Sequence, residues 1–148
     1  MNNRNVGLIG LGAMGSGMAQ SLRRANYHVH VCDARPGVAE AFARDGGVAC
    51  ATPADVAAAC EVVISVVVNA QQTEAVLFGE GGAATAMHAG GVFVMCSTVD
   101  PNWSIALEVM LIPCRFARLA ISALTLLLLV LFIVFLLFLY GRLFRLHP

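Results

Sequence analysis

The chain has 148 residues, enough to bury one substantial core but too few for two domains of ordinary size. Its nine positive residues are all Arg and balance nine acidic residues, so nothing in the composition favours a nucleic-acid partner. The balance conceals an asymmetry. Residues 1–110 hold five Arg and nine acids, whereas residues 111–148 hold four Arg and no acid.

The five cysteines are scattered, with no CxxC pair, and their number is odd. This pattern favours reduced thiols over a disulfide framework, and we expect no metal site. The first residues, Met-Asn-Asn-Arg, lead directly into an apolar run without the long hydrophobic region of a secretory signal. We therefore expect residues 1–110 to be cytoplasmic.

Short β-branched runs alternate with alanine-rich stretches through the first 110 residues, a pattern typical of βαβ units and a parallel sheet. We expect a helix to begin after Thr52, because Thr52 can cap it, Pro53 suits its first position and Asp55 complements its dipole. The apolar run from Val62 to Val68 predicts a central strand buried on both faces. The expected strands are 6–9, 29–32, a short one near 48, 62–68 and 92–95, and the expected helices are 14–25, 37–44, 53–60, 71–78 and 101–110.

The composition changes abruptly near Met110. Residues 119–140 contain no charge, and seventeen of these twenty-two are Leu, Ile, Val or Phe, without the polar stripe of an amphipathic helix. A helix of this length would measure about 33 Å, against about 30 Å for the hydrocarbon core of a bilayer. We therefore treat 111–148 as a hydrophobic tail in which 119–140 is a candidate transmembrane helix. Two Arg on each side leave its orientation undetermined.

A glycine-rich turn, Gly10-Leu11-Gly12-Ala13-Met14-Gly15, stands between the first expected strand and the first expected helix. In a GxGxxG turn the first glycine permits a tight turn, the second lets the backbone approach a pyrophosphate, and the third allows close helix packing. The helix start at Ala13 and Met14 would offer backbone N–H groups to the phosphate charge. Residues 1–110 are accordingly predicted to form an α/β domain of the Rossmann type, a parallel sheet with helices on both faces that binds a dinucleotide.

An acidic residue, Asp33, ends the second expected strand, eighteen residues after Gly15. A carboxylate in this place accepts hydrogen bonds from the ribose hydroxyls of the cofactor and repels a 2′-phosphate, which favours NAD over NADP. Arg35 leaves NADP open as the less favoured alternative, because a nearby Arg can accommodate the phosphate.

The segment Val6 to Gly15 resembles the opening signature of the β-hydroxyacid dehydrogenase family, which includes 3-hydroxyisobutyrate dehydrogenase and tartronate semialdehyde reductase. Two later segments, Glu61 to Asn69 and Cys96 to Pro101, resemble the family's fourth-strand segment and its Ser/Thr-rich loop before a proline. The amino-acid sequences of these segments are most similar to those of the L-threonate dehydrogenase branch. The resemblance implies that the cofactor is contacted by Val68, Asn69, Thr73 and Thr98, in addition to the residues of the glycine-rich turn, and the substrate by Ser97.

The resemblance ends near Glu108. It implies a substrate loop, a catalytic Lys and a second, helical domain, whereas the chain contains no Lys. We therefore assign no catalytic residue and expect an NAD-binding domain of a 3-hydroxyacid oxidoreductase that is truncated and catalytically incomplete, with a small hydroxyacid as partner only if the missing half is supplied. Two alternatives stay open: a membrane-anchored nucleotide-binding module, and a nonfunctional product of a gene frameshifted near residue 109.

Overall fold

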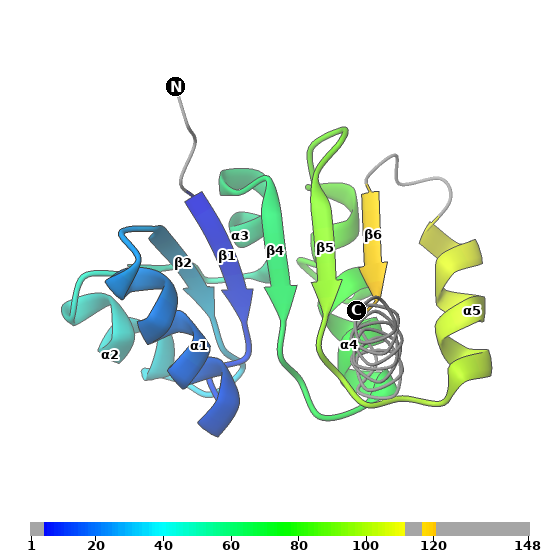
Figure 1. Cartoon of the computed structure of the whole chain (residues 1–148), viewed down its shortest axis with the longest axis horizontal. Coiled ribbons are helices and arrows are strands. Elements are labelled where there is room, and N and C mark those ends of the chain that lie inside the picture. Colours follow the sequence, from blue (N-terminus) through cyan, green and yellow to red (C-terminus); the bar gives the residue numbers. More distant parts are fainter. Residues whose placement is uncertain (1–4, 112–116, 121–148) are drawn as a thin grey trace, which may run out of the picture.

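A computed structural model describes residues 5–111 and 117–120. Six parallel strands form one sheet in the order β3-β2-β1-β4-β5-β6, so the chain starts in the middle and builds outward in both directions (Figure 1). The strands are β1 (Asn5–Ile9), β2 (His28–Cys32), β3 (Val48–Ala49), β4 (Val62–Ser65), β5 (Val92–Met95) and β6 (Ala117–Ala120). The helices are α1 (Ala13–Arg24), α2 (Val38–Arg44), α3 (Pro53–Ala59), α4 (Ala70–Phe78), the 3-10 helix η1 (Ala83–Thr85) and α5 (Pro101–Leu111).

After β3 at one edge of the sheet, the chain crosses back to β4 on the other side of β1. Strands are then added in the opposite direction, and this change puts helices on both faces. Helix α1 lies in front of the sheet in Figure 1, with α2 to its left, whereas α3 and α4 lie behind the sheet. Ala19 of α1 and Ala39 of α2 pack in one core cluster, so these two helices share a face. Ligands of open parallel sheets bind outside the carboxyl ends of the strands at the point where the strand order reverses. In this sheet that point lies between β1 and β4, at the glycine-rich turn.

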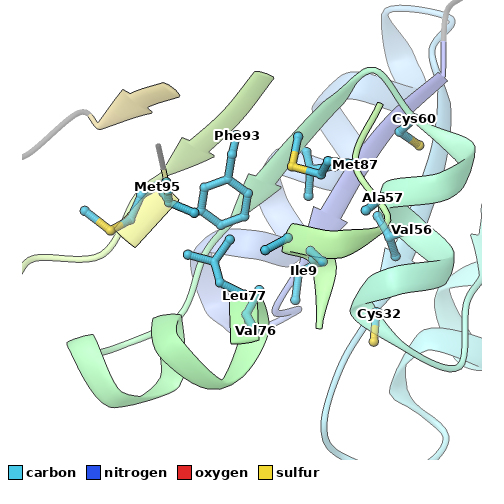
Figure 2. Packing of buried hydrophobic residues seen from close by; sticks show 14 of the residues in the cluster. Ile9, Cys32, Val56, Ala57, Cys60, Val76, Leu77, Met87, Phe93 and Met95 are labelled. Carbon is cyan, nitrogen blue, oxygen red and sulfur yellow. The ribbon is translucent and has the colours of Figure 1, made fainter. Parts of the chain in front are cut away.

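The face covered by α3, α4, η1 and α5 carries the larger core cluster. Phe93 of β5 points toward Leu77 of α4, with Met95 beside them and Met87 on the other side (Figure 2). Leu77 is 1% exposed and Phe93 3% exposed. Large side chains therefore fill the space between this face and its helices.

The opposite face, which we call the α1/α2 face, has a smaller cluster over the first half of the sheet. Leu8, Val29 and Val31 are fully buried there, beneath Ala19 of α1 and Ala39 of α2. The side chains of β4 and β5 that alternate with the buried ones are only partly buried, namely Val62, Ile64, Val92 and Val94. In the part of the chain that the structure describes, this face is thus covered over β1 and β2 but incompletely over β4 and β5.

The expected strands and helices of residues 5–111 are confirmed in type and order. Thr52 and Asp55 form the expected capping box at the start of α3: the Thr52 hydroxyl accepts the Asp55 backbone N–H, and the Asp55 carboxylate accepts the N–H of Thr52. The expected strand at 62–68 is too long. The strand ends at Ser65, and Val68 is 79% exposed. The prediction was wrong here because an apolar run in the sequence does not mark where a strand leaves the sheet.

The sheet continues beyond residue 110. β6 pairs in parallel with β5, with Leu119 opposite Val94 and Ala120 opposite Met95, so these two residues lie in a strand and not at the start of a helix. The remainder of the expected apolar helix falls outside the described residues. No helix in the described part of the chain is long and apolar enough to cross a bilayer.

Candidate functional site

Four chain segments meet at the carboxyl edge of the sheet. Backbone hydrogen bonds join each to its neighbour: Gly10 donates to Cys32 at 2.9 Å, Val66 donates to Ile9 at 2.8 Å, and Cys96 donates to Ser65 at 2.9 Å. The turns that follow β2, β1, β4 and β5 are therefore held side by side. All the predicted site residues lie on these four turns or on the first turns of the helices that follow β1 and β4.

The three glycines of the turn after β1 meet different surroundings. Gly10 has φ +97°, and a Cβ there would lie 2.5 Å from the carbonyl oxygen of Val66. A Cβ on Gly15 would collide with the carbonyl oxygen of Gly10. A Cβ on Gly12, in contrast, would meet no atom within 4 Å. Gly10 and Gly15 are thus required by the fold itself, whereas the space in front of Gly12 is open.

Gly12 is also the N-cap of α1, and no side chain caps this helix start. Ala13 and Met14 are exposed there, and Met14 is 69% exposed. The first N–H groups of a helix carry its partial positive charge and bind anions when nothing else satisfies them. The open space at Gly12 and the uncapped start of a twelve-residue helix together form a cradle that fits a diphosphate.

Asp33 follows β2 and faces this turn. Its Oδ2 accepts the backbone N–H of Leu11 at 2.6 Å, and its side chain is only 7% exposed. The carboxylate thereby fixes the glycine-rich turn, a role separate from the predicted contact with a ribose. This second role was not foreseen, although the eighteen-residue spacing from Gly15 indicates the proximity.

Arg35 donates three hydrogen bonds to the same carboxylate. Its backbone N–H and its Nε donate to Oδ1, each at 2.9 Å, while its Nη2 donates to Oδ2 at 3.1 Å and to the carbonyl oxygen of Leu11 at 3.1 Å. These hydrogen bonds, chiefly those of the guanidinium and assisted by the Leu11 N–H, lower the pKa of Asp33 to about 2 against the opposing effect of burial. Asp33 is therefore ionised at every physiological pH.

The turn after β4 begins helix α4. Asn69 caps this helix by accepting the backbone N–H of Gln72 at 2.9 Å, and the Gln72 amide oxygen accepts the N–H of Val68 at 2.9 Å. Both Val68 and Asn69 are exposed. Since Val67 lies 3.3 Å from a Cβ built on Gly10, this turn adjoins the glycine-rich turn.

Ser97, after β5, lies beneath that turn. Its hydroxyl donates to the carbonyl oxygen of Val67 at 2.8 Å and lies 3.1 Å from the hydroxyl of Thr73, which in turn lies 3.0 Å from the carbonyl oxygen of Asn69. Ser97 is 2% exposed and Thr73 is fully buried. Thr98, the next residue, is exposed. In this arrangement Ser97 and Thr73 brace the turn after β4, and Thr98 is the residue of the loop that is open to a ligand.

The four described cysteines are all free; Cys32 and Cys60 are buried in the core, and Cys50 and Cys96 are half-buried. Burial raises the pKa of every one of these thiols, to about 12 for Cys60. They are protonated at neutral pH, a state that neither attacks substrates nor binds metals. Among the described residues, no group of three His, Cys, Asp or Glu side chains could hold a metal ion.

Residues 5–114 match the family model described as the NAD binding domain of 6-phosphogluconate dehydrogenase. L-threonate dehydrogenase from Cupriavidus necator is 57% identical over 105 residues, which are 71% of this chain and 35% of that protein. The chain therefore spans about a third of the length of this relative.

Solved structures agree with the fold. A 3-hydroxyisobutyrate dehydrogenase from Salmonella typhimurium superposes with a TM-score of 0.71 at 29% identity, over 77% of this chain and 40% of that one. An imine reductase from Myxococcus stipitatus in complex with NADP+ has a TM-score of 0.71 at 17% identity, over 78% and 39% of the two chains, and shares the fold alone.

Proposed function

Since this chain belongs to the 6-phosphogluconate and β-hydroxyacid dehydrogenase family through its NAD(P)-binding domain, we propose that it binds NAD in preference to NADP at the carboxyl edge of its sheet. The pyrophosphate would lie against Gly12 and the first turn of α1. The adenosine ribose would bind Asp33, and the nicotinamide end would approach Val68, Asn69 and Thr98.

The observation that carries this proposal is the contrast among the three glycines. A turn built only for tight folding would enclose all three, yet the space at Gly12 is open while Gly10 and Gly15 are closed by backbone atoms. Gly12 has a φ of −63°, which any residue can adopt, so the backbone conformation does not require a glycine there, and the missing Cβ instead allows the close approach of a ligand.

Calorimetric titration of the full chain with NAD tests the proposal, using two alanine variants. Both Gly12 and Gly17 leave room for a Cβ in the protein alone, since neither has an atom within 4 Å. Gly12→Ala should weaken NAD binding at least about tenfold by pushing the pyrophosphate away, whereas Gly17→Ala, one turn along α1, should leave it unchanged. Equal affinities of the two variants would contradict the proposed site.

The preference for NAD rests on the ionised Asp33, which would repel a 2′-phosphate. Asp33→Ala should lose affinity for NAD and narrow the difference between NAD and NADP. Tighter binding of NADP than NAD by the unaltered chain would refute the assignment. The fold itself accepts either cofactor, since the Myxococcus stipitatus imine reductase is solved with NADP+ and a variant of it with NAD+.

For this chain we propose cofactor binding and not a complete oxidoreductase reaction. The relatives' names suggest a small hydroxyacid such as L-threonate as the substrate of a complete enzyme. Because these 148 residues contain no Lys and match about a third of that relative, we expect the full chain to show no NAD-dependent oxidation of L-threonate above background. A steady-state rate from a pure sample would contradict this expectation and require another proton acceptor.

A second proposal concerns the tail. Residues 121–140, which follow β6, contain no charge, and as a helix twenty residues would measure about 30 Å, the hydrocarbon thickness of a bilayer. We propose that this segment anchors the nucleotide-binding domain to a membrane. Carbonate extraction of a membrane fraction should leave the chain in the pellet. Its release, together with a monodisperse sample without detergent, would favour a helix packed against the sheet.

A further inference from the structure

The carboxylate of Asp33 has no acceptor position left. An ionised carboxylate accepts roughly four hydrogen bonds, two on each oxygen. Oδ1 receives the backbone N–H and the Nε of Arg35, and Oδ2 receives the Leu11 N–H and the Nη2 of Arg35. A ribose could therefore bind Asp33 only by displacing a donor that is already there.

The four donors differ in whether they can leave. Those of Leu11 and of the Arg35 backbone are held by the chain, the first within the glycine-rich turn and the second within the loop that follows β2. The guanidinium donors can leave, since the Arg35 side chain is 60% exposed and its contacts end on Asp33 and the Leu11 carbonyl oxygen. Rotation of this one side chain opens one position on each carboxylate oxygen.

Two vacated positions, one per oxygen, match the two adjacent hydroxyls of a ribose. We propose that the guanidinium of Arg35 is an internal stand-in for the ribose hydroxyls of the cofactor, displaced when NAD binds and retained as the phosphate ligand when NADP binds. The inference rests on the proposed function, because it concerns the same site. It makes Arg35 a specificity-determining residue that opposes one cofactor and assists the other.

The two cofactors should then respond in opposite directions to the loss of this side chain. NAD binding breaks the contact between the Arg35 guanidinium and Asp33. A variant without the Arg35 side chain does not have to break this contact. An exposed ion pair is weak, so Arg35→Ala should tighten NAD binding by about twofold to fivefold. With NADP, the retained guanidinium binds the 2′-phosphate, so the same change should weaken NADP binding by about tenfold or more.

The test is titration of the full chain with NAD and with NADP. Arg35→Ala and Arg35→Gln are compared with Arg44→Ala, which removes an exposed positive charge from the end of α2 and should change neither affinity. Thermal unfolding by circular dichroism verifies that each variant is folded. A double-mutant cycle adds a readout that a structural role would not move: in an Asp33→Ala background, removal of Arg35 should no longer tighten NAD binding.

Three outcomes decide the matter. Opposite shifts for NAD and NADP that vanish, for NAD, in the Asp33→Ala background support the stand-in. Weaker binding of both cofactors by Arg35→Ala, or a gain in NAD affinity that persists without Asp33, overturns it while leaving the proposed function intact. Failure of the unaltered chain and of Arg35→Ala to bind either dinucleotide overturns both.

Discussion

The two faces of the sheet are built by different means. On the face of α3, α4 and α5, large side chains such as Leu77 and Phe93 separate the helices from the strands. On the α1/α2 face, α1 approaches closely through Gly15, where even a Cβ would collide with backbone. The face of α3, α4 and α5 is stabilised by the packing of large apolar side chains. The α1/α2 face instead brings the start of α1 close to the end of β1.

The faces also differ in how far they are covered. The groove beside α1 has a volume of about 660 Å³ and is lined by Met14, Gly17, Met18, Leu22 and Ile64, among others. It lies over the side of β4 that the described helices leave partly open. The α1/α2 face, which carries the helix start at Gly12, is therefore the less completely covered of the two.

The largest expected effect is on the covered face. Leu77→Ala should reduce the free energy of unfolding by about 3 kcal/mol, because it removes buried methyl groups and leaves a cavity beside Phe93. Denaturant unfolding of the full chain measures the change. A loss below about 1 kcal/mol would show that this face is less tightly packed than the structure indicates.

Gly15→Ala should cost about 2 kcal/mol on the α1/α2 face, because the new Cβ must displace α1 from the Gly10 carbonyl oxygen. It should also weaken NAD binding, since the helix start would move with α1. Gly17→Ala on the same helix is the matched control, having open space around it, and should be neutral or slightly stabilising. Equal effects of the two changes would contradict the close approach at Gly15.

The sequence predicted the glycine-rich turn and the helix that begins after Thr52, because both follow from local patterns. Spacing identified Gly10, Gly12 and Gly15, and the Thr52 cap identified the start of α3. The end of β4 was missed, because Val66 to Val68 are as apolar as the strand before them.

The sequence predicted which residues belong to the candidate site, but it did not predict the hydrogen bonds among them. Asp33 was placed near the ribose, whereas its bond to Leu11 and its enclosure by Arg35 depend on how two turns meet in space. The burial of Ser97 is likewise invisible in a loop sequence, because it results from Thr73 and Val67 closing over it. The paired strand β6 was missed because charge and hydropathy after residue 110 indicated only a tail.

Ile64→Ala distinguishes the two faces more finely. Ile64 points to the α1/α2 face and is only partly buried, so its truncation should cost about 1 kcal/mol, well below the cost at Leu77. The measurement is again denaturant unfolding of the full chain. A cost equal to that of Leu77→Ala would mean that another segment covers β4, and the apolar residues 121–140 would then be the first to test by deletion.

The smallest expected effect is the pH dependence contributed by Asp33 at the rim of the α1/α2 face. Its pKa is lowered from 3.8 to about 2 in the folded chain, so the folded state binds this proton less readily than the unfolded state. The stabilisation is therefore complete above about pH 4 and is lost as the pH falls through 2. Because Arg35 is 60% exposed, we expect only about 1 kcal/mol at neutral pH. Asp33→Asn provides the control: its free energy of unfolding should lie below that of the unaltered chain at pH 7, and the difference should shrink steadily between pH 4 and pH 2. A difference that stays constant over this range would mean that the carboxylate's charge contributes nothing to folding, and that Asp33 fixes the turn at Leu11 through shape and hydrogen bonding alone.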